Sequence, residues 1–449
     1  MRPISEQSHT GYKESLVDQM SEKIRDTGRS YNAVDTGKIV RISINARNHD
    51  PLQWLSAQKI YPSVYWSDRL NQFETAGVGV TVSSNNIYDL KINNFQNNVR
   101  FFGGFRFDKS LVKGSPWYRM NRAIFVLPRF ELTRTNAGNE FVCNLNFPDD
   151  LDKINEIEDQ LNGLQFDNKE NDITIPELLN RTDKPDKEEW KLNIQKILDL
   201  IAAGKVEKLV SARESTLEFS ANLDPVFILR NLKKSTPGCF HFCFQPETDY
   251  AFIGASPERL YYRKKNQIIS EALAGTRARG NTADDDYRLG NELLNSEKDI
   301  REQSYVSKSI MKNLDQLCCK LSVDKETILM KLTRVQHLMT GIEGKLIEGT
   351  TNQEILESLH PTPAVGGYPQ EKAIDLISEI EPFDRGWYTG PVGWISKDEA
   401  DFAVAIRSGL IVKNKLHLYA GAGIVKGSDP DNEWNEIESK IATFMKILS

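Results

Sequence analysis

Segments with alternating apolar and polar residues recur along this chain, and they limit which folds it can adopt. In the first half they cover residues 38–46, 63–69, 77–82, 99–107, 123–135 and 140–147. In the second half they cover residues 208–215, 239–245, 250–256, 333–346, 390–396, 401–412 and 415–425, with a hairpin over residues 258–275. Such alternation is typical of strands with one buried face. Helices here alternate with hairpins and not with single strands, so we predict an α+β fold. Its large mixed or antiparallel sheets pack face to face, with helices on the outside.

Helices are predicted where apolar residues recur at three- and four-residue spacing. They cover part of residues 1–40 and residues 51–58, 149–163, 188–205, 224–235, 284–317 and the C-terminal stretch after residue 430. Asp224 and Pro225 mark a helix start, and Gly204 marks a helix end. The polar residues 180–190 are predicted to form a surface connection. We expect a single large domain, 1–449, with a β-rich half over residues 1–185 and a catalytic half over residues 186–448.

Composition excludes several classes of protein. The 449 residues carry a net charge of −6 without a basic run that could follow a phosphate backbone, so we expect no nucleic-acid partner. The N-terminus lacks the pattern of a signal peptide, and no stretch approaches the roughly 18 apolar residues of a membrane span. We therefore expect a cytoplasmic monomer that does not bind membranes. The five cysteines include no CxxC pair, and we predict that they are buried and reduced.

A lysine lies within one of the apolar rows. Alternation puts Val206, Lys208, Val210 and Ala212 on one face of a strand. Desolvation in such a row lowers the pKa of an ammonium group, so the neutral amine can act as a general base. A lysine at a sheet edge whose amine reaches water fits the same pattern. Alternation alone leaves both interpretations open.

Glu258 follows a proline at the end of the strand predicted over residues 250–256. The ring of Pro257 stiffens the turn that presents the carboxyl group. If Glu258 faced Lys208 across a cavity, the two could act as acid and base on opposite faces of one substrate. A glutamate after a proline is common, so this spacing is weak evidence by itself.

Two predicted helices each carry a pair of carboxylates three residues apart. The pairs are Asp299 with Glu302 and Glu433 with Glu436, and Ser296 is the predicted cap of the first helix. Oxygen ligands suit Mg²⁺, which keeps several waters and takes one or two protein carboxylates. Solvated helix faces carry the same spacing by chance, and the pattern does not separate the two cases.

Two glycine-rich stretches and an arginine indicate anion binding. Residues 271–280 and 419–430 each follow an apolar strand, and their glycines let backbone N–H groups approach an anion. Neither stretch matches a nucleotide-binding fingerprint in its required context. Arg407 ends an apolar strand, where its forked donor suits a substrate carboxylate. A structural ion pair is equally consistent with that position.

Taken in order along the chain, these stretches resemble the chorismate-utilising enzymes. The similarity runs from Glu188 to Ile447. It is carried by EKLVSARE, FIGASPERL, SEALAGTR, SEKDIREQ, LHPTPAVGG, GPVGW, FAVAIRSG and YAGAGIVKGSDPDNEWNEIESK. The resemblance implies the α+β fold shared with anthranilate synthase component I. It also implies chorismate as the substrate and Mg²⁺ as the cofactor.

The same resemblance implies roles for individual residues. It makes Lys208 the base that activates water and Glu258 the general acid. The other implied residues are the metal ligands Glu302 and Glu436, then Asp299 and Glu433 holding metal-bound waters, and finally Gly275, Thr276, His337, Ala364, Ile406, Arg407, Gly421 and Lys440 around the substrate.

Two positions narrow the implied activity within the family. Isochorismate and salicylate synthases carry a lysine at the position of Lys208, which anthranilate synthases lack. Aminodeoxychorismate synthases carry a lysine where this chain has Ala274. Residues 51–69 resemble the isochorismate synthases of the menaquinone pathway more than those of siderophore pathways. We therefore expect an isomerase with isochorismate synthase activity in menaquinone biosynthesis. The alternatives are salicylate synthesis, isochorismate synthesis for a siderophore, or a non-catalytic chorismate-binding subunit.

Overall fold

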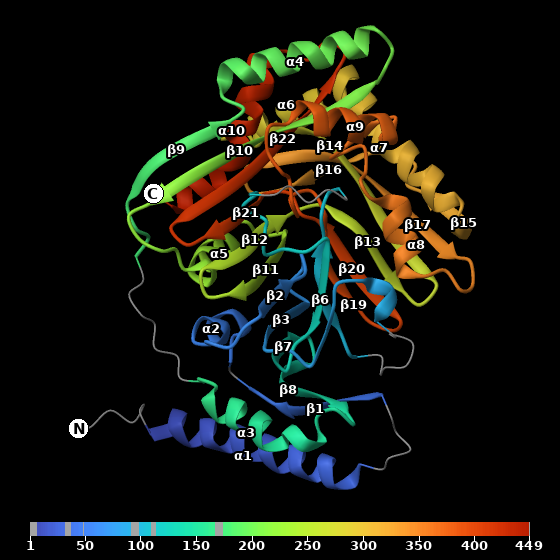
Figure 1. Cartoon of the computed structure of the whole chain (residues 1–449). Coiled ribbons are helices and arrows are strands. Elements are labelled where there is room, and N and C mark those ends of the chain that lie inside the picture. Colours follow the sequence, from blue (N-terminus) through green and yellow to red (C-terminus); the bar gives the residue numbers. More distant parts are fainter. Residues whose placement is uncertain are drawn as a thin grey trace.

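The strands of this protein form two large sheets that run through the middle of the molecule (Figure 1). The computed structural model describes residues 7–31, 37–47, 49–90, 98–108, 114–166 and 174–448. Within these residues every strand pair is antiparallel. The predicted antiparallel architecture is therefore confirmed.

The first sheet has 12 strands among the described residues and contains segments from both halves of the chain. In order across the sheet they are β1 (Lys38–Asn45), β8 (Gly138–Phe147), β7 (Phe130–Thr135), β3 (Phe73–Val78), β2 (Ser63–Ser67), β11 (Phe240–Glu247), β12 (Tyr250–Ser256), β21 (Ser408–Val412), β22 (Lys415–Val425), β10 (Lys208–Phe219) and β18 (Gly367–Tyr368), with β9 (Leu178–Lys184) also paired to β10. The junction between the halves is the pair β2–β11.

The second sheet has 10 strands in the same described ranges. In order they are β15 (Cys318–Val323), β17 (Val335–Leu346), β14 (Gln267–Ala278), β13 (Arg259–Lys264), β20 (Glu399–Val404), β19 (Pro391–Ile395), β5 (Phe101–Phe105), β6 (Ala123–Leu127) and β4 (Val82–Ser84), with β16 (Ile328–Lys331) also paired to β17. Here the pair β5–β19 joins the two halves of the chain.

Helices cover the outer faces of both sheets. They are α1 (Gln7–Ser30), α2 (Pro51–Ser56), α3 (Ile154–Gly163), α4 (Lys187–Ala202), α5 (Pro225–Ser235), α6 (Ala283–Leu294), α7 (Glu297–Asp315), α8 (Asn352–Leu359), α9 (Gln370–Ile380) and α10 (Pro430–Ile447). The predicted caps are confirmed. Asp224 accepts a hydrogen bond from the Phe227 N–H at the start of α5, and Ser296 accepts one from the Asp299 N–H at the start of α7.

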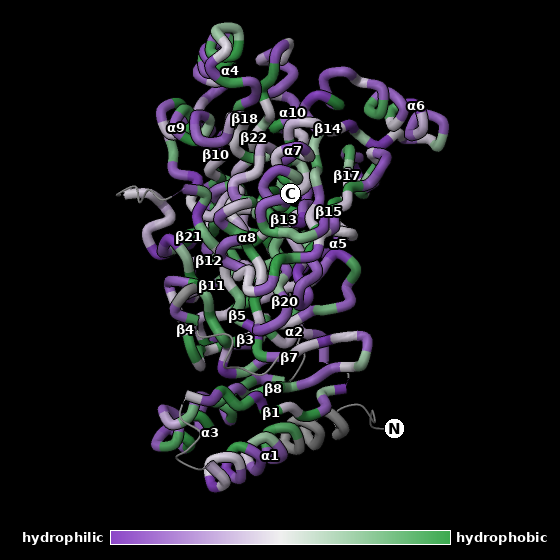
Figure 2. The backbone as a smooth tube through the Cα atoms, turned by 90° about the vertical axis from the view of Figure 1, so that its right-hand side faces the viewer, coloured by the Kyte–Doolittle hydropathy of each residue, from purple (hydrophilic) through white to green (hydrophobic). Residues whose placement is uncertain are grey.

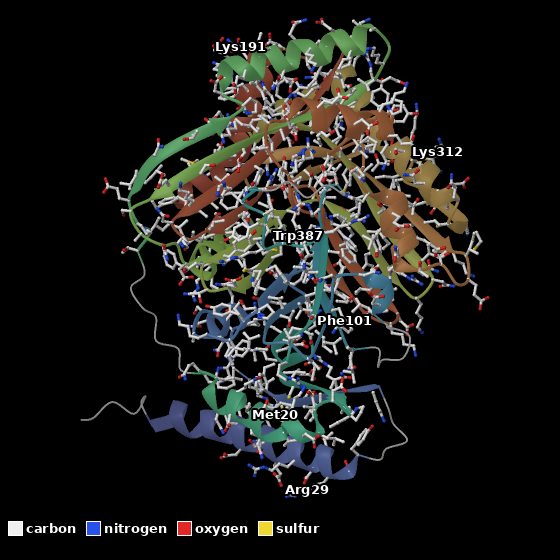
Figure 3. The ribbon with its side chains drawn as sticks, viewed as in Figure 1. Met20, Arg29, Phe101, Lys191, Lys312 and Trp387 are labelled. Carbon is white, nitrogen blue, oxygen red and sulfur yellow. The ribbon has the colours of Figure 1, made fainter. Side chains whose placement is uncertain are left out.

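Hydrophobic cores fill the spaces between these layers. Trp66 of the first sheet and Phe102 of the second belong to one core between the sheets, which confirms their face-to-face packing. Trp387 belongs to the same core and lies in the middle of the molecule (Figure 3). A second core lies under α7 and α8, and a third connects the first sheet with helices that include α1 and α10. Figure 2 shows the apolar segments concentrated on inner strands, while outer helices such as α6 are largely hydrophilic.

Several connections cross from one sheet to the other, and sequence alternation did not predict these crossings. Residues 123–135 and 401–412 were each predicted as one strand. Instead, β6 and β7 lie in different sheets, and so do β20 and β21. The breaks occur at Pro128, which cannot continue the hydrogen-bonded ladder, and at Arg407, whose φ is +50°. Another crossing leads from β12 to β13 through Pro257 and Glu258.

Other predictions of local structure also needed correction. Residues 77–82 are not one strand, because β3 ends at Val78 and β4 begins at Val82. The predicted surface connection at residues 180–190 includes part of β9. The helical stretch 284–317 divides into α6 and α7 at Ser296. Four of the cysteines are buried as predicted, but Cys319 is exposed.

In the described ranges, no helix is both long and apolar enough to cross a membrane. The division at residue 186, the monomeric state, the cytoplasmic location and the absence of nucleic-acid binding stay predictions.

Candidate active site

One cavity gathers almost all of the predicted site residues, although they come from eight separate stretches of the chain. Its lining includes every predicted residue except Lys208: Glu258, Gly275, Thr276, Asp299, Glu302, His337, Ala364, Ile406, Arg407, Gly421, Glu433, Glu436 and Lys440. The space that the centre of a water molecule can reach is about 120 Å³. Strands of both sheets and the helices α7 and α10 contribute to its walls.

Lys208 lies immediately behind this lining. Its side chain is fully buried at the start of β10, and its Nζ lies 2.9 Å from Oε1 of Glu302, which lines the cavity. Gly423 on the neighbouring strand makes room for this pair. A Cβ at Gly423 would lie 2.5 Å from Glu302 Oε1 and 2.9 Å from Lys208 Cε. The amine of Lys208 is therefore buried beside a cavity carboxylate, and Lys208 is not the exposed sheet-edge lysine that alternation also allowed.

Glu258 reaches the cavity from the crossing between β12 and β13, and its environment favours the neutral carboxyl form. Burial raises its pKa to about 8; the charge of Lys208 opposes this shift and that of Glu271 adds to it. At neutral pH the carboxyl group is therefore mostly protonated, and it can donate a proton.

The four carboxylates on α7 and α10 all line the cavity, and each pairs with a different cation. Their closest ion-pair contacts are Glu302 with Lys208 at 2.9 Å, Asp299 with Arg277 at 2.8 Å, Glu433 with Lys298 at 2.8 Å, and Glu436 with Lys440 at 2.7 Å. The stripe of α10 that bears Glu433, Glu436 and Lys440 therefore faces the cavity and is not a solvated rim.

Electrostatics distinguishes the two carboxylates of α10. Burial raises the pKa of Glu433, although its ion pair with Lys298 opposes the shift. Burial also acts to raise the pKa of Glu436. The charge and hydrogen bond of Lys440, with the charges of Lys298 and Arg277, outweigh this effect, so the pKa of Glu436 is lowered. Glu436 is thus held as a carboxylate that faces the cavity.

The donor atoms suit a hard divalent cation. Glu302 and Glu436 bring carboxylate oxygens to one cavity, and Mg²⁺ takes one or two protein carboxylates and completes its shell with water and substrate oxygens. Among the described residues, no group of three or more acidic, histidine or cysteine side chains is close enough to hold a metal by itself. The arrangement therefore fits a cation that shares its ligands with a substrate, and not a closed structural metal site.

A network of hydrogen bonds holds Arg407 in the wall of the cavity. Nη2 of Arg407 donates to Nε2 of His337 at 2.9 Å. The proton of the imidazole therefore lies on Nδ1, which is 3.2 Å from the carbonyl oxygen of Gly275. Burial, together with the charge of Arg407, lowers the pKa of His337 to about 3, so it is neutral. A buried guanidinium with donors to spare is well suited to a carboxylate.

Backbone conformation also shapes the wall of the cavity. Gly275 has φ of +69° at a β-bulge in β14, and a Cβ there would lie 3.2 Å from the Cβ of Asp299. Arg407 itself adopts φ of +50°, a conformation that costs non-glycine residues about 1–3 kcal/mol. Lys440 donates to the carbonyl oxygen of Gly421 at 2.8 Å, which ties α10 to β22.

Several cavity residues were not predicted from the sequence. Tyr388 and Tyr419 stack with their ring centres 5.3 Å apart, and Trp117 donates to the Tyr419 hydroxyl at 3.0 Å. Arg277 and Lys298 were missed although they lie within motifs that were recognised, next to Thr276 and Asp299. Arg277 of β14 pairs with Asp299 of α7, and Lys298 of α7 pairs with Glu433 of α10. Both pairings depend on how these elements pack together, which the sequence motifs do not show.

Comparison with known sequences identifies the family of this chain. The profile of the family described as chorismate binding enzyme matches residues 25–449. The chain is 37% identical over 358 residues to isochorismate synthase MenF of Bacillus subtilis, and the match covers 77% of this chain and 74% of that protein.

Comparison with solved structures gives the same result. The structure of MenF, the menaquinone-specific isochorismate synthase from Escherichia coli, matches with a TM-score of 0.85 at 28% identity and covers 97% of this chain and 99% of that one. Anthranilate synthase component I from Streptococcus pneumoniae matches with a TM-score of 0.65 at 19% identity, over 91% and 92% of the two chains. The second match concerns the fold alone, and the predicted fold class is confirmed.

Proposed function

Because this chain belongs to the family of chorismate-binding enzymes, we propose that it is an isochorismate synthase of menaquinone biosynthesis. The reaction isomerises chorismate: the oxygen of water adds to ring C2, the C4 hydroxyl leaves as water, and the ring double bonds shift between these carbons. Reactant and product are isomers of similar energy, so the enzyme catalyses the reaction in both directions.

The observation that carries this proposal is the pairing of a buried lysine with a neutral carboxyl group at one cavity. Lys208 takes a proton from the water that attacks C2. Glu258 is protonated at neutral pH because burial raises its pKa to about 8, and it donates that proton to the departing C4 hydroxyl. The reverse reaction exchanges the two roles.

The carboxylates of α7 and α10 are proposed to hold Mg²⁺. Glu302 and Glu436 supply direct ligands, and Asp299 and Glu433 hold bound waters. When bound, Mg²⁺ neutralises and orients a substrate carboxylate. Glu302 also lies 2.9 Å from Nζ of Lys208, so the proposed base and a proposed metal ligand are neighbours. Arg277 and Lys298 keep Asp299 and Glu433 fixed beside these ligands.

The enolpyruvyl end of the substrate is assigned to the part of the cavity wall that contains Arg407. Arg407 receives its carboxylate, and His337 fixes the guanidinium by accepting one of its N–H groups. The remaining substrate contacts are the predicted ones, from Gly275, Thr276, Ala364, Ile406, Gly421 and Lys440. Such positioning would bring the ring carbons close to Lys208 and Glu258.

A product assay tests the proposal directly. The purified protein is incubated with chorismate, with and without Mg²⁺, and the products are separated by chromatography. We expect isochorismate and chorismate at a constant final ratio that is the same from either starting compound, and no reaction without Mg²⁺. Salicylate with pyruvate would instead identify a salicylate synthase, and the absence of turnover would point to a binding subunit.

A further inference from the structure

We infer that the ion pair between Arg69 and Glu271 positions Glu258, the proposed general acid. Arg69 belongs to the β-rich half of the chain, so this contact gives that half a part in catalysis. The inference rests on the proposed function, because that function gives Glu258 its role. Neither Arg69 nor Glu271 lines the cavity, so both act through Glu258 as positioning residues.

Arg69 reaches the turn that carries Glu258 from two residues beyond β2. Its Nη1 donates to the carbonyl oxygen of Pro257 at 3.0 Å, and its Nη2 pairs with Oε1 of Glu271. The guanidinium also lies over the ring of Phe240, at 5.2 Å from the ring centre. A planar guanidinium can hold two acceptors at a fixed angle, and the single ammonium of a lysine cannot reproduce that geometry.

The backbone contacted by Arg69 is the backbone that aims Glu258. Ser256 accepts from the Glu258 N–H at 3.2 Å and donates to the carbonyl oxygen of Val404 at 2.6 Å. The N–H of Val404 donates to the carbonyl oxygen of Glu258 at 3.0 Å. These bonds fix both sides of the turn to the second sheet, and Arg69 fixes Pro257 between them. Loss of Arg69 therefore removes the donor that holds the carbonyl group of Pro257, the residue immediately before Glu258.

Glu271 also affects the protonation of Glu258, because its charge raises the pKa of that carboxyl group. It is 8% exposed on β14, and its Oε2 makes no hydrogen bond within the described parts of the chain. The charges that reach Glu258 come from Lys208 of β10, Glu271 of β14 and Lys440 of α10, and Tyr388 faces it before β19. Among these charges only Glu271 is negative, so it favours the protonated acid while the two lysines oppose it.

A purely structural ion pair would have different consequences. Breaking a buried pair destabilises a protein because one charge is left without its partner. Such a loss lowers the melting temperature, but it does not move the pH at which a particular carboxyl group titrates. The pH profile and the separation of kcat from KM therefore distinguish positioning of the acid from general stabilisation.

The experiment uses the full chain with three variants and one control. Glu271→Gln removes the charge and keeps the shape, Arg69→Met removes the forked donor, and Arg69→Lys keeps a charge without the fork. The control is Arg119→Met, which breaks another arginine–glutamate pair, with Glu247 at the end of β11. For each protein we measure melting temperature, kcat and KM for chorismate, and the dependence of kcat on pH.

We expect each variant of this pair to lower kcat. For Arg69→Met the loss is about 10-fold or more with little change in KM, because a misplaced catalytic group slows the reaction without weakening binding. Arg69→Lys should lie between it and the wild type. Glu271→Gln should move the alkaline limb of kcat to lower pH, by at least about 0.5 unit. Arg119→Met should match the wild type.

A measurement that needs no turnover separates this inference from the proposed function. The infrared band of the protonated Glu258 carboxyl, identified by its loss in Glu258→Gln, is followed against pH. We expect its midpoint to fall in Glu271→Gln but not in Arg119→Met. Unchanged kcat, pH profile and infrared midpoint in the pair variants would overturn the inference. A wild type that makes no isochorismate would overturn the proposed function instead. If Glu271→Gln does not fold, kcat and KM of Arg69→Lys decide.

Discussion

Lys208 and Glu258 acquire their chemistry from burial and from the charges around them. Lys208 is buried with its amine next to a carboxylate, while Glu258 is a buried carboxyl group whose pKa is raised to about 8. The raised pKa does not belong to the residue type, since a free glutamate titrates far below neutrality. β10 begins at Lys208, and β12 ends two residues before Glu258. The ends of these strands thus determine the surroundings of both side chains.

Removal of the base is the first test at this scale. For Lys208→Ala we expect isomerisation to slow by at least about 100-fold, because the water at C2 loses its proton acceptor. Binding of chorismate, measured by calorimetry, should persist because Arg407 and the metal site remain. The control Lys205→Ala removes an exposed lysine three residues earlier and should behave as the wild type. Substantial activity in Lys208→Ala would show that another group is the base.

The raised pKa of Glu258 predicts how activity depends on pH. The forward reaction needs the protonated acid, so kcat should fall as pH rises through about 8. The sign for stability follows from the same shift. The folded protein binds this proton more tightly than the unfolded chain does, so the contribution of Glu258 to stability declines between its unfolded pKa and about 8.

The variant Glu258→Gln separates these two effects. It should lose activity at every pH, and its melting temperature should exceed that of the wild type most clearly above pH 8, where the buried carboxylate is costly. Thermal melts at a series of pH values measure this. A wild type whose kcat stays level well above pH 9 would contradict the assignment of Glu258 as the acid.

At the scale of secondary structure elements, the sequence predicted positions better than connections. Alternation located the strands, and the motifs with their family resemblance identified 13 of the 24 residues that line the cavity. The crossings at Pro128 and Arg407 were not predicted, because alternation shows which residues face a core but not which sheet provides it. The polar strand β9 was missed for a related reason. It pairs with β10 through backbone groups, which any side chains permit.

Gly423 on β22 offers a test of how strands shape the metal site. In Gly423→Ala the new methyl group would contact Glu302 Oε1 and Lys208 Cε, and the end of the glutamate side chain can move away at little cost. We therefore expect a melting temperature close to that of the wild type but weaker Mg²⁺ binding, by about 10-fold or more. Calorimetry with Mg²⁺ alone measures this. Gly163→Ala, whose Cβ would meet no atom within 4 Å, is the control. Unchanged Mg²⁺ affinity would remove Glu302 from the metal site.

At the scale of the whole molecule, the β-rich half completes the sheets of the catalytic half. β2 pairs with β11 in one sheet, and β5 pairs with β19 in the other. In Figure 1, α1 and α4 lie at opposite ends of the molecule, and these sheets span the distance between them. Figure 3 shows Met20 on the inner side of α1, where it is fully buried, and Arg29 pointing away. The division at residue 186 therefore does not coincide with a gap in the sheets or in the core between them.

This continuity predicts that the two halves unfold together. A chain of 449 residues exceeds the size at which a single cooperative transition is routine, so two transitions would be the ordinary expectation for separate domains. Here the loss of either half exposes the edge of β2 or β11 and one wall of the core around Trp66 and Trp387. We expect tryptophan fluorescence and far-ultraviolet circular dichroism to give coincident transitions in urea. Hydrogen exchange of β2 and β11 should then report equal opening free energies, whereas a well-separated transition of either half would show that the sheets join two independent units.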